Sequence, residues 1–435
     1  MGRSDDPRVQ AQLDRLSTLS IQRDVLGLDA VRELLRRLGD PHKRLPPTFH
    51  VAGTNGKGST CAFLRAMLEA EGYTVHVTTS PHLVRYNERF RVAGRLIENA
   101  RLAELLEEVF DAAEGLGCSF FEITIAAAFT EFARVPADAC VVEVGLGGRL
   151  DATNVLQPDV LAACGIAALG IDHERFLLAP EDGVPQDPMA RIAFEKAGIA
   201  KAGVPLVTMG RTYPEQAREA IAATASLVEA PVLEFGDHWA IDEWLGGYYS
   251  EGKSDLFQVW DVAIDGQHQF LNAGLAIAMV RHQDRVPVSE EAILDGLKNT
   301  HWPARLQRLR PGPLTALVPD QQITLDGGHN WSAGLAISEG RSETENSLHV
   351  ILGMLDNKDP KALIEPLGTR IRSLSIVPVP GHDAHPADAF GEIAVARADL
   401  EDALLNIPSD DYPILIAGSL YLAGEALRLN DEIPD

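Results

Sequence analysis

Short apolar runs alternate along the chain with segments in which apolar residues recur at helical spacing. Several of these runs are continuous, as expected for parallel strands that are covered on both faces. The predicted strands of the first part of the chain span residues 49–51, 75–78, 139–144, 160–165 and 205–209. The predicted helices span residues 100–113, 123–132, 191–201 and 272–282. This alternation predicts a doubly wound α/β domain with a mostly parallel sheet.

The pattern changes twice after residue 230. Residues 230–268 predict a small antiparallel excursion, because they place several aromatic side chains among polar residues: Trp239, Trp244, Tyr248, Tyr249, Phe257 and Trp260. A helix is expected over residues 289–298, and the sequence T-H-W-P-A-R at 300–305 then interrupts the alternation. Four further strands, alternating with helices, are predicted at residues 322–325, 348–352, 374–377 and 414–417. We therefore expect two domains, residues 1–301 and a smaller α/β domain at residues 302–435.

The net charge of the chain limits which classes of partner it is expected to bind. Among 435 residues, 38 are Lys or Arg and 63 are Asp or Glu, which gives a formal charge of −25. So acidic a chain is a poor candidate for nonspecific binding to nucleic acid or to a membrane surface. The longest apolar stretches, such as residues 123–129, are too short to span a bilayer. We expect no nucleic-acid or membrane partner, and local cations must attract any anionic substrate.

The cysteines and the first residues indicate a compartment. Cys61, Cys118, Cys140 and Cys164 lie far apart without a C-x-x-C pair, which suits reduced thiols and gives no metal signature. The first residues lack the apolar core of a signal peptide, and Asp6 stands where a myristoylation motif needs Ser or Thr. These features predict a cytoplasmic protein.

The sequence H-V-A-G-T-N-G-K-G-S-T at residues 50–60 predicts a strand, a glycine-rich turn and the start of a helix. Glycines allow the backbone N–H groups to approach an anion, and Lys57 and the helix dipole add positive charge. Ser59 or Thr60 offers a hydroxyl to Mg²⁺. These groups predict a P-loop-type socket for nucleotide phosphates, although Gly58 separates the lysine from the usual Ser or Thr. The alternative is a glycine-rich connection that binds no ligand.

Three polar residues follow apolar runs at predicted strand ends. Glu143 lies inside an apolar run, where an unpaired carboxylate is costly, and it is well placed to hold Mg²⁺. The alternative is an ion pair with Arg149. His173 offers a neutral imidazole to a metal, and Ser80 offers a hydroxyl. Taken alone, these two residues also suit a structural histidine and an ordinary turn.

Two further residues have both a functional and an ordinary interpretation. Lys196 lies on a predicted helix of mixed polarity, where a lysine is commonly at the surface. Asp326 ends the first strand of the second domain and precedes two glycines, a placement typical of ribose binding in such sheets. A turn in which the aspartate accepts backbone hydrogen bonds explains it equally well.

The order of these segments resembles the folylpolyglutamate synthase/dihydrofolate synthase family of the ATP-dependent Mur ligase superfamily. The resemblance extends from about residue 27 to residue 425. It is carried by H-V-A-G-T-N-G-K-G-S-T, S-P-H-L-V-R-Y-N-E-R, S-F-F-E, V-E-V-G-L-G-G-R-L-D-A-T-N, G-I-D-H, F-E-K-A-G-I, D-G-G-H-N, L-G-M-L-D-N-K-D and G-S-L-Y. It implies an ATPase domain, a Rossmann-like domain and an active site in the cleft between them.

The resemblance also implies roles for individual residues. Ser80 and Glu143, assisted by Ser59, are expected to bind one Mg²⁺, and His173 a second. Lys196 matches a lysine that is carbamoylated in this family to N6-carboxylysine, an anionic partner for the second metal. The expected catalytic residues are Lys57, His173 and Lys196. The expected ATP contacts are Thr54, Asn55, Gly56, Lys57, Gly58, Ser59, Asn272, Arg305 and Asp326.

The implied substrates are dihydropteroate, folates, L-glutamate and ATP. The residues matched to the pteroate site are Ser119, Phe120, Phe121, Glu122, Leu150, Asp151 and Ala152. His329 and Ser419 are expected to contact glutamate. ATP would phosphorylate a substrate carboxylate, and the amine of glutamate would attack the acyl phosphate. We expect a bifunctional enzyme and a monomer.

Alternative functions and two departures from the family stay open. The alternatives are a folylpolyglutamate synthase without the second activity, a Mur-type ligase acting on a cell-wall precursor, a nucleotide sensor and a plain P-loop kinase. Ala304 stands where the family commonly has glycine before the arginine, which puts the backbone path there in doubt. Residues 176–187 form a longer and more proline-rich segment than the family pattern predicts.

Overall fold

The computed structural model describes residues 4–19, 27–242, 248–251, 255–259, 261–339 and 347–435. Its first unit is built on an eight-stranded sheet in the order β4-β3-β2-β5-β1-β6-β7-β8, in which β2, β5, β1, β6, β7 and β8 run parallel. The strands are β1 (Thr48–Ala52), β2 (Val75–Thr78), β3 (Arg91–Val92), β4 (Arg95–Leu96), β5 (Ala139–Glu143), β6 (Leu161–Ile166), β7 (Leu206–Thr208) and β8 (Val232–Glu234). All residues of β1, β2, β5, β6 and β7 are buried, as predicted for parallel strands that are covered on both faces.

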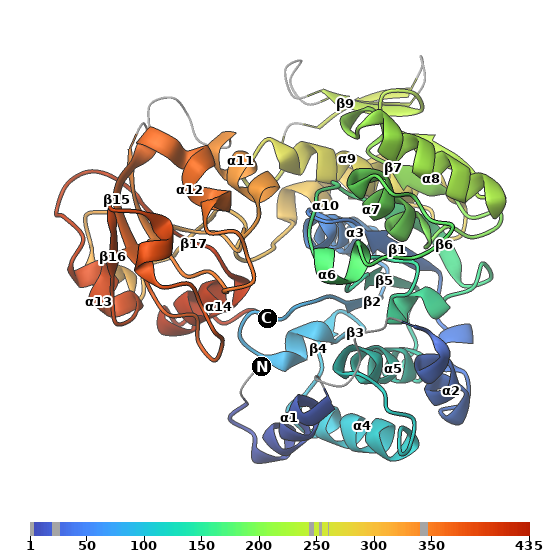
Figure 1. The fold of residues 1–435 in the computed structure, drawn as a ribbon. Helices are drawn as coiled ribbons and strands as arrows, with labels where there is room; N and C mark the ends of the chain where they lie inside the picture. The colour runs from blue at the N-terminus through green and yellow to red at the C-terminus, as the bar shows by residue number, and fades with distance from the viewer. Residues whose placement is uncertain (1–3, 20–26, 243–247, 252–254, 260, 340–346) are drawn as a thin grey trace.

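Helices cover this sheet (Figure 1). α3 packs on β1, β2 and β5 and against α9 and α10, whereas α5 packs against α1, α2 and α4, and α7 pairs with α8. These helices are α1 (Pro7–Leu19), α2 (Asp29–Arg37), α3 (Lys57–Ala70), α4 (Asn99–Ala112), α5 (Phe120–Phe132), α6 (Glu174–Leu177), α7 (Pro188–Ala197), α8 (Glu215–Leu227), α9 (His268–Arg281) and α10 (Glu290–Asn299). Among the described residues, no helix combines the length and the apolar character that crossing a membrane requires.

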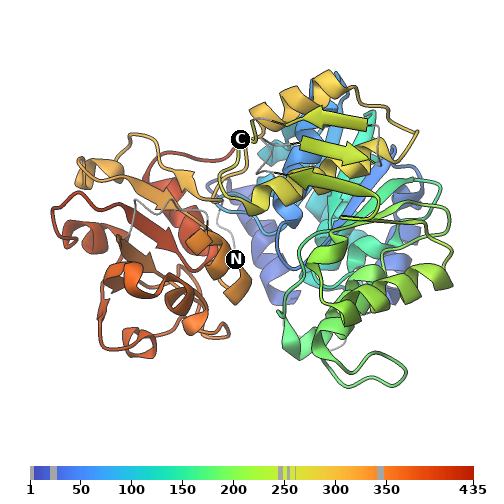
Figure 2. The ribbon, with the colours of Figure 1, turned by 90° about the horizontal axis from the view of Figure 1, so that it is seen from above.

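A three-stranded antiparallel sheet follows β8 and packs on α9. It consists of β9 (Trp239–Asp242), β10 (Tyr248–Glu251) and β11 (Asp255–Gln258). Figure 2 shows it beside α9, above the large sheet. The predicted excursion is therefore present, but it is shorter than residues 230–268, because β8 adds a parallel strand to the large sheet. Trp244 and Trp260 lie outside the described residues.

The second unit has a six-stranded sheet in the order β12-β13-β17-β14-β15-β16, in which only β12 pairs antiparallel. Its strands are β12 (Gln307–Arg308), β13 (Ile323–Leu325), β14 (Leu348–Leu352), β15 (Ile371–Ile376), β16 (Ala394–Ala396) and β17 (Ile414–Ala417). Its helices are α11 (Trp331–Glu339), α12 (Lys361–Leu367), α13 (Leu400–Leu405) and α14 (Leu420–Leu429). The predicted class, a doubly wound, mostly parallel sheet followed by a smaller α/β unit, is confirmed.

The two units have separate buried cores. The core of the large unit extends to Leu297, and the cores of the small unit begin at Ala304. In Figure 1 the small unit, in orange and red, lies beside the large one, and the C-terminus lies near the junction. The division at residues 301 and 302 stays a prediction, and this distribution of buried residues supports it.

Candidate active site

A cavity of about 670 Å³ lies between the two units, at the carboxyl ends of the parallel strands of the large sheet. This is the edge at which open α/β sheets bind ligands. Residues of the small unit, among them Asp326 and Ser419, line it from the other side. Of the candidate site residues, Lys196 does not line the cavity, and neither does Thr60, whose hydroxyl donates to the Gly56 carbonyl at 2.9 Å. The cavity brings together the others: Thr54, Asn55, Gly56, Lys57, Gly58, Ser59, Ser80, Ser119, Phe120, Phe121, Glu122, Glu143, Leu150, Asp151, Ala152, His173, Asn272, Arg305, Asp326, His329 and Ser419.

The glycine-rich turn connects β1 to α3. Gly56 has a φ of 82°, and a Cβ atom built there would lie 2.3 Å from Asn272 Oδ1. The turn therefore needs glycine at this position both for its backbone conformation and for the close approach of α9. The Lys57 ammonium donates to the carbonyls of Gly53 and Thr54 at 3.0 and 3.3 Å. The lysine thus folds back over the turn, toward the place where a phosphate would lie.

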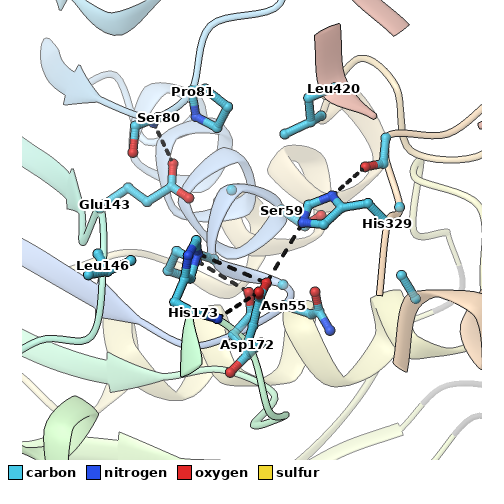
Figure 3. A pocket seen from close by; sticks show the side chains of 18 of the residues that line it. Asn55, Ser59, Ser80, Pro81, Glu143, Leu146, Asp172, His173, His329 and Leu420 are labelled. Atoms are coloured by element: carbon cyan, nitrogen blue, oxygen red, sulfur yellow. Dashed lines mark hydrogen bonds and ion pairs between the residues drawn. The ribbon is translucent and has the colours of Figure 1, made fainter. Parts of the chain in front are cut away.

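Glu143 ends β5 beside this turn. Its Oε2 accepts the backbone N–H of Ser80 at 2.9 Å, as Figure 3 shows. Burial raises the pKa of Glu143, and the nearby charge of Lys57 opposes that shift. The alternative of an ion pair with Arg149 is wrong, because that guanidinium bonds to Glu195 at 2.9 Å and to Glu181 at 2.6 Å.

The donors around Glu143 suit a hard cation. The cavity is lined here by the Glu143 carboxylate and by the serine residues Ser59 and Ser80. Mg²⁺ prefers such oxygen ligands, and it usually binds through one or two carboxylates together with substrate phosphates. A buried carboxylate with one hydrogen bond fits this requirement, because a bound cation would compensate its burial.

His173 belongs to a charged cluster that the two units share. Desolvation by the surrounding protein lowers the pKa of its imidazole to about 4, although 46% of the side chain is exposed, so the ring is neutral at pH 7 and able to bind a metal. Its Nε2 lies 3.9 Å from Asp172 Oδ2. Lys358 of the small unit donates to Asp172 Oδ1 at 2.6 Å. His329 Nε2 lies 3.8 Å from Asp172 Oδ2 (Figure 3). Burial alone would raise the pKa of Asp172, but its contacts with His329, His173 and Lys358 lower it well below the ordinary value.

Lys196 is buried near the end of α7 and does not line the cavity. Its exposed fraction is 3%, so the alternative of a surface lysine is wrong. Burial lowers the pKa of its amine to about 7, and the charge of Lys57 adds to this shift. Lys196 also contributes to the lowered pKa of His173, which places the two side chains within electrostatic range. The amine is therefore neutral in a substantial fraction of molecules near pH 7.

The segment matched to the pteroate site begins α5. Ser119 and Glu122 form a capping box: the Ser119 N–H donates to Glu122 Oε2 at 2.7 Å, and the Glu122 N–H donates to Ser119 Oγ at 3.3 Å. The other carboxylate oxygen, Oε1, is buried and has no hydrogen-bond partner in the part of the chain that the structure describes. Phe120 and Phe121 line the cavity beside it. The segment thus presents aromatic surface and one free acceptor to a ligand.

Asp151 shapes the wall next to this segment. Its carboxylate accepts the backbone N–H groups of Leu146 at 2.8 Å and Thr153 at 3.0 Å. It therefore fixes the loop after β5, so that Leu150 and Ala152 face the cavity.

The polar residues of the small unit are mostly engaged with their own backbone. Asp326 accepts the N–H groups of Leu306 at 2.9 Å and Gly328 at 2.7 Å, the bonds expected from the turn interpretation. Ser419 caps α14 by accepting the N–H of Tyr421 at 3.1 Å. Both residues still line the cavity, so a structural role and contact with a ligand are compatible here.

The structure resolves the doubt about residue 304. Ala304 has a φ of 58° and is buried, so an L-residue adopts the left-handed conformation that glycine favours. Alanine thus adopts the backbone conformation that glycine would favour here, and Arg305 lines the cavity. Residues 176–187 are held through Glu181, whose Oε2 accepts from Arg149 at 2.6 Å and from Arg191 at 2.7 Å.

Several cavity residues received no role from the sequence. Arg89 and Lys358 lie inside motifs that were recognised, S-P-H-L-V-R-Y-N-E-R and L-G-M-L-D-N-K-D, and that was the available signal for them. Asp172 and Tyr421 likewise lie inside G-I-D-H and G-S-L-Y, whereas His268 and Gln269 lie outside every quoted motif. The residues missed are Arg89, Asp172, His268, Gln269, Lys358 and Tyr421.

Comparisons with known proteins identify relatives of the chain. No family model matches the chain. The chain is 30% identical over 93% of its length to the dihydrofolate synthetase of Saccharomyces cerevisiae and covers 98% of that protein. It is 32% identical to the dihydrofolate synthase/folylpolyglutamate synthase of Bacillus subtilis, with 92% of this chain and 94% of the relative covered. The chain spans 49% of the length of a 32% identical relative from Halobacterium salinarum.

Solved structures share the fold. The Escherichia coli FolC structure in complex with DHPP and ADP is 27% identical and superposes with a TM-score of 0.82 over 97% of each chain. The Yersinia pestis folylpolyglutamate synthase/dihydrofolate synthase complexed with AMPPNP and Mn is 27% identical, with a TM-score of 0.83 over 98% of this chain and 99% of that one. The chain therefore belongs to the folylpolyglutamate synthase/dihydrofolate synthase family.

Proposed function

We propose that this protein is an ATP-dependent ligase that joins L-glutamate to dihydropteroate and to folates through an acyl phosphate. The observation that carries the proposal is the convergence of the glycine-rich turn, the buried Glu143 and the neutral His173 at one edge of one sheet. The relatives named above are dihydrofolate and folylpolyglutamate synthases. The Rossmann-like small unit would close the site.

The nucleotide lies across the turn in this proposal. The backbone of residues 54–59, Lys57 and Arg305 hold the phosphates, and Asn272 and Asp326 contact the rest of ATP. Glu143, Ser80 and Ser59 would hold one Mg²⁺, and His173 would contribute to a second. When bound, such ions neutralise the charge that develops on the transferred phosphoryl group. The Yersinia pestis complex contains AMPPNP and Mn, which supports this assignment.

The acid substrate lies against α5. A pterin is flat and rich in hydrogen-bonding groups, which suits Phe120, Phe121 and the free Oε1 of Glu122. Leu150, Asp151 and Ala152 form the adjacent wall. The carboxylate of the acid then faces the phosphates, and its attack on the terminal phosphorus releases ADP and leaves an acyl phosphate. His329 and Ser419 would hold glutamate, whose amine attacks the acyl carbon and displaces phosphate.

Lys196 would act as a carbamate. Its neutral amine attacks CO₂, an N–C bond forms as one C=O π bond breaks, and the nitrogen releases one proton to solvent, so a neutral group becomes an anion. Counted from the protonated lysine, two protons are released. Burial and Lys57 lower the pKa of the amine to about 7, which makes the neutral form available. The positive charge of Lys57 would also stabilise the negatively charged carbamate.

The alternatives predict different substrates. A folylpolyglutamate synthase without the second activity would accept tetrahydrofolate but not dihydropteroate, and a Mur-type ligase would accept neither. The deciding experiment measures ADP release by the purified protein with each acid, with and without L-glutamate. We expect glutamate-dependent release with both acids. Release with neither acid would contradict the proposal. A monomer and a cytoplasmic location stay predictions.

A further inference from the structure

Arg89 is a buried cation in the wall of the cavity. It ends the short 3₁₀ helix Tyr86–Arg89, which follows the Ser80 turn, and its exposed fraction is 6%. Its side chain lines the cavity together with Ser80, Phe120 and Glu143. A guanidinium group is always charged, so its burial needs compensation. The nucleotide and substrate assignments above give this residue no role.

The contacts of Arg89 fix its position without neutralising it. Its Nε donates to His82 Nδ1 at 2.9 Å. Burial and the arginine charge hold the pKa of His82 well below its ordinary value, so the imidazole is a neutral acceptor. The guanidinium carbon lies 5.3 Å from the centre of the Phe120 ring and 5.6 Å from that of Tyr86. Within the described ranges, no carboxylate lies within 4.0 Å of it, and neither Nη atom has a hydrogen-bond partner.

A second buried arginine shows how unusual this arrangement is. Arg191 has an exposed fraction of 5% and does not line the cavity. It forms ion pairs with Glu195 at 3.1 Å and with Glu181 at 2.7 Å. Buried charges are ordinarily paired in this way. Arg89 has the same burial and a cavity in front of it in place of a carboxylate.

We propose that Arg89 binds the carboxylate of the acid substrate, so that a ligand anion supplies the missing counter-ion. The inference rests on the proposed ligase function. Arginine suits this role because its two Nη groups match the two oxygens of a carboxylate. With Nε bound to His82, the Nη groups remain for the ligand.

The location selects the acid over the other two anionic substrates. The ring contact with Phe120 places Arg89 at the pteroate segment. The charges of Arg89 and Glu143 interact, so the guanidinium also lies near the proposed metal edge. The acid must present its carboxylate at this junction in order to meet the terminal phosphate. The phosphates already have Lys57 and Arg305, and glutamate is expected on the small-unit side.

The test uses the full chain, with Mg²⁺ and ADP present, and two probes: pteroate and the analogue in which its carboxylate is a neutral carboxamide. We expect the wild type to prefer pteroate. Arg89→Met should weaken pteroate binding about tenfold to a hundredfold, the range for a charge-assisted hydrogen bond, and change carboxamide binding less than twofold. Arg89→Lys keeps the charge and should retain part of the preference. In turnover, Arg89→Met should raise the KM for the acid and leave the KM for glutamate unchanged.

Arg191→Met is the matched control, since it removes an equally buried arginine outside the cavity. It should lower the Tm and leave the preference for pteroate unchanged. An equal loss of both probes in Arg89→Met, or a raised KM for glutamate alone, would overturn the inference. If Arg89→Met does not fold, the Arg89→Lys variant and the wild type supply the test. The inference would be overturned if Arg89→Lys preferred pteroate over the carboxamide as strongly as wild type, or if the wild type bound both probes equally. A wild type that performs ligation but does not discriminate contradicts this inference alone, whereas one that neither binds nor performs ligation contradicts the proposed function.

Discussion

The two sides of the cavity use their buried polar groups in opposite ways. On the large-unit side, Glu143 has one backbone hydrogen bond, and Lys196 has no hydrogen bond or ion pair among the described residues. Burial shifts the pKa of each toward its neutral form. On the small-unit side, Asp326 and Ser419 satisfy backbone N–H groups at strand and helix ends. Groups of the first kind cost stability and are free for ligands, whereas groups of the second kind hold the fold together.

The largest expected effect comes from Lys196→Met. We expect ligation to fall by at least about a thousandfold, because the carbamate and its electrostatic contribution are lost. The Tm should stay the same or rise, because an unpaired buried amine is replaced by an apolar side chain of similar size. ADP release and thermal unfolding measure the two effects, and nucleotide binding should persist.

Lys201→Met is the control for Lys196→Met. Lys201 is a partly buried lysine near the same helix, and its ammonium donates to Asn154 Oδ1 at 2.5 Å. Its substitution should lower the Tm and preserve turnover. Normal turnover by Lys196→Met would show that the large-unit side does not depend on this amine.

Glu143→Gln should reduce kcat about a hundredfold and raise the Mg²⁺ concentration needed for half-maximal rate, because a neutral amide is a weak ligand for a hard cation. The Tm should change little, since among the described residues the buried carboxylate accepts only the bond from Ser80. Glu131→Gln is the matched control. Glu131 is equally buried but pairs with Arg101 at 2.9 and 2.7 Å, so its loss should affect stability and spare activity. If Glu143→Gln lowered stability and spared activity while Glu131→Gln did the opposite, the contrast between ligand-binding and structural carboxylates would be wrong.

The ionisation of Lys196 predicts that ligation activity falls about tenfold for each pH unit below the pKa of this amine, which is about 7. Below that pKa the amine is protonated and cannot attack CO₂, so activity should rise between pH 6 and 8 and respond to added bicarbonate. Without CO₂, the unfolded lysine, with its ordinary pKa of 10.5, holds a proton that the folded one has lost. Stability should therefore rise with pH between about 7 and 10.5. Activity that is independent of bicarbonate at every pH would contradict the carbamate.

Asp326→Asn tests the small-unit side and should give the smallest loss of activity. The amide can replace only one acceptor, so one buried N–H loses its partner. The free energy of unfolding should fall by about 1–3 kcal/mol. Chemical denaturation measures this change, and saturating ATP should restore most of the turnover. Full stability together with abolished turnover would place Asp326 with the large-unit residues.

The elements that the sequence predicts well are those whose pattern follows from burial. The run around Glu143 is apolar because β5 is covered on both faces, and it was predicted almost to the residue. The strand Ala394–Ala396 was missed because it has three residues at a half-exposed edge. The helix Pro7–Leu19 was also missed, because its apolar residues are widely separated by polar ones.

The site residues likewise divide into those that a local motif identifies and those that depend on contacts between distant segments. The turn around Lys57 is a local motif, so the sequence identifies it directly. The burial of Lys196 and the unpaired charge of Arg89 depend on segments that are distant along the chain, and spacing alone suggested a surface position for the lysine. The contact of Asp172 with Lys358 joins residues 186 positions apart, and no local pattern encodes it.

The central claim is that the large-unit edge transfers the terminal phosphoryl group of ATP to the carboxylate of the acid. Its most direct test uses dihydropteroate labelled with ¹⁸O in both carboxylate oxygens, with ATP and glutamate, and mass analysis of the phosphate released. We predict one ¹⁸O atom in each phosphate, because the oxygen that attacks phosphorus departs with it. Phosphate without label, formed alongside the glutamate adduct, would contradict the account.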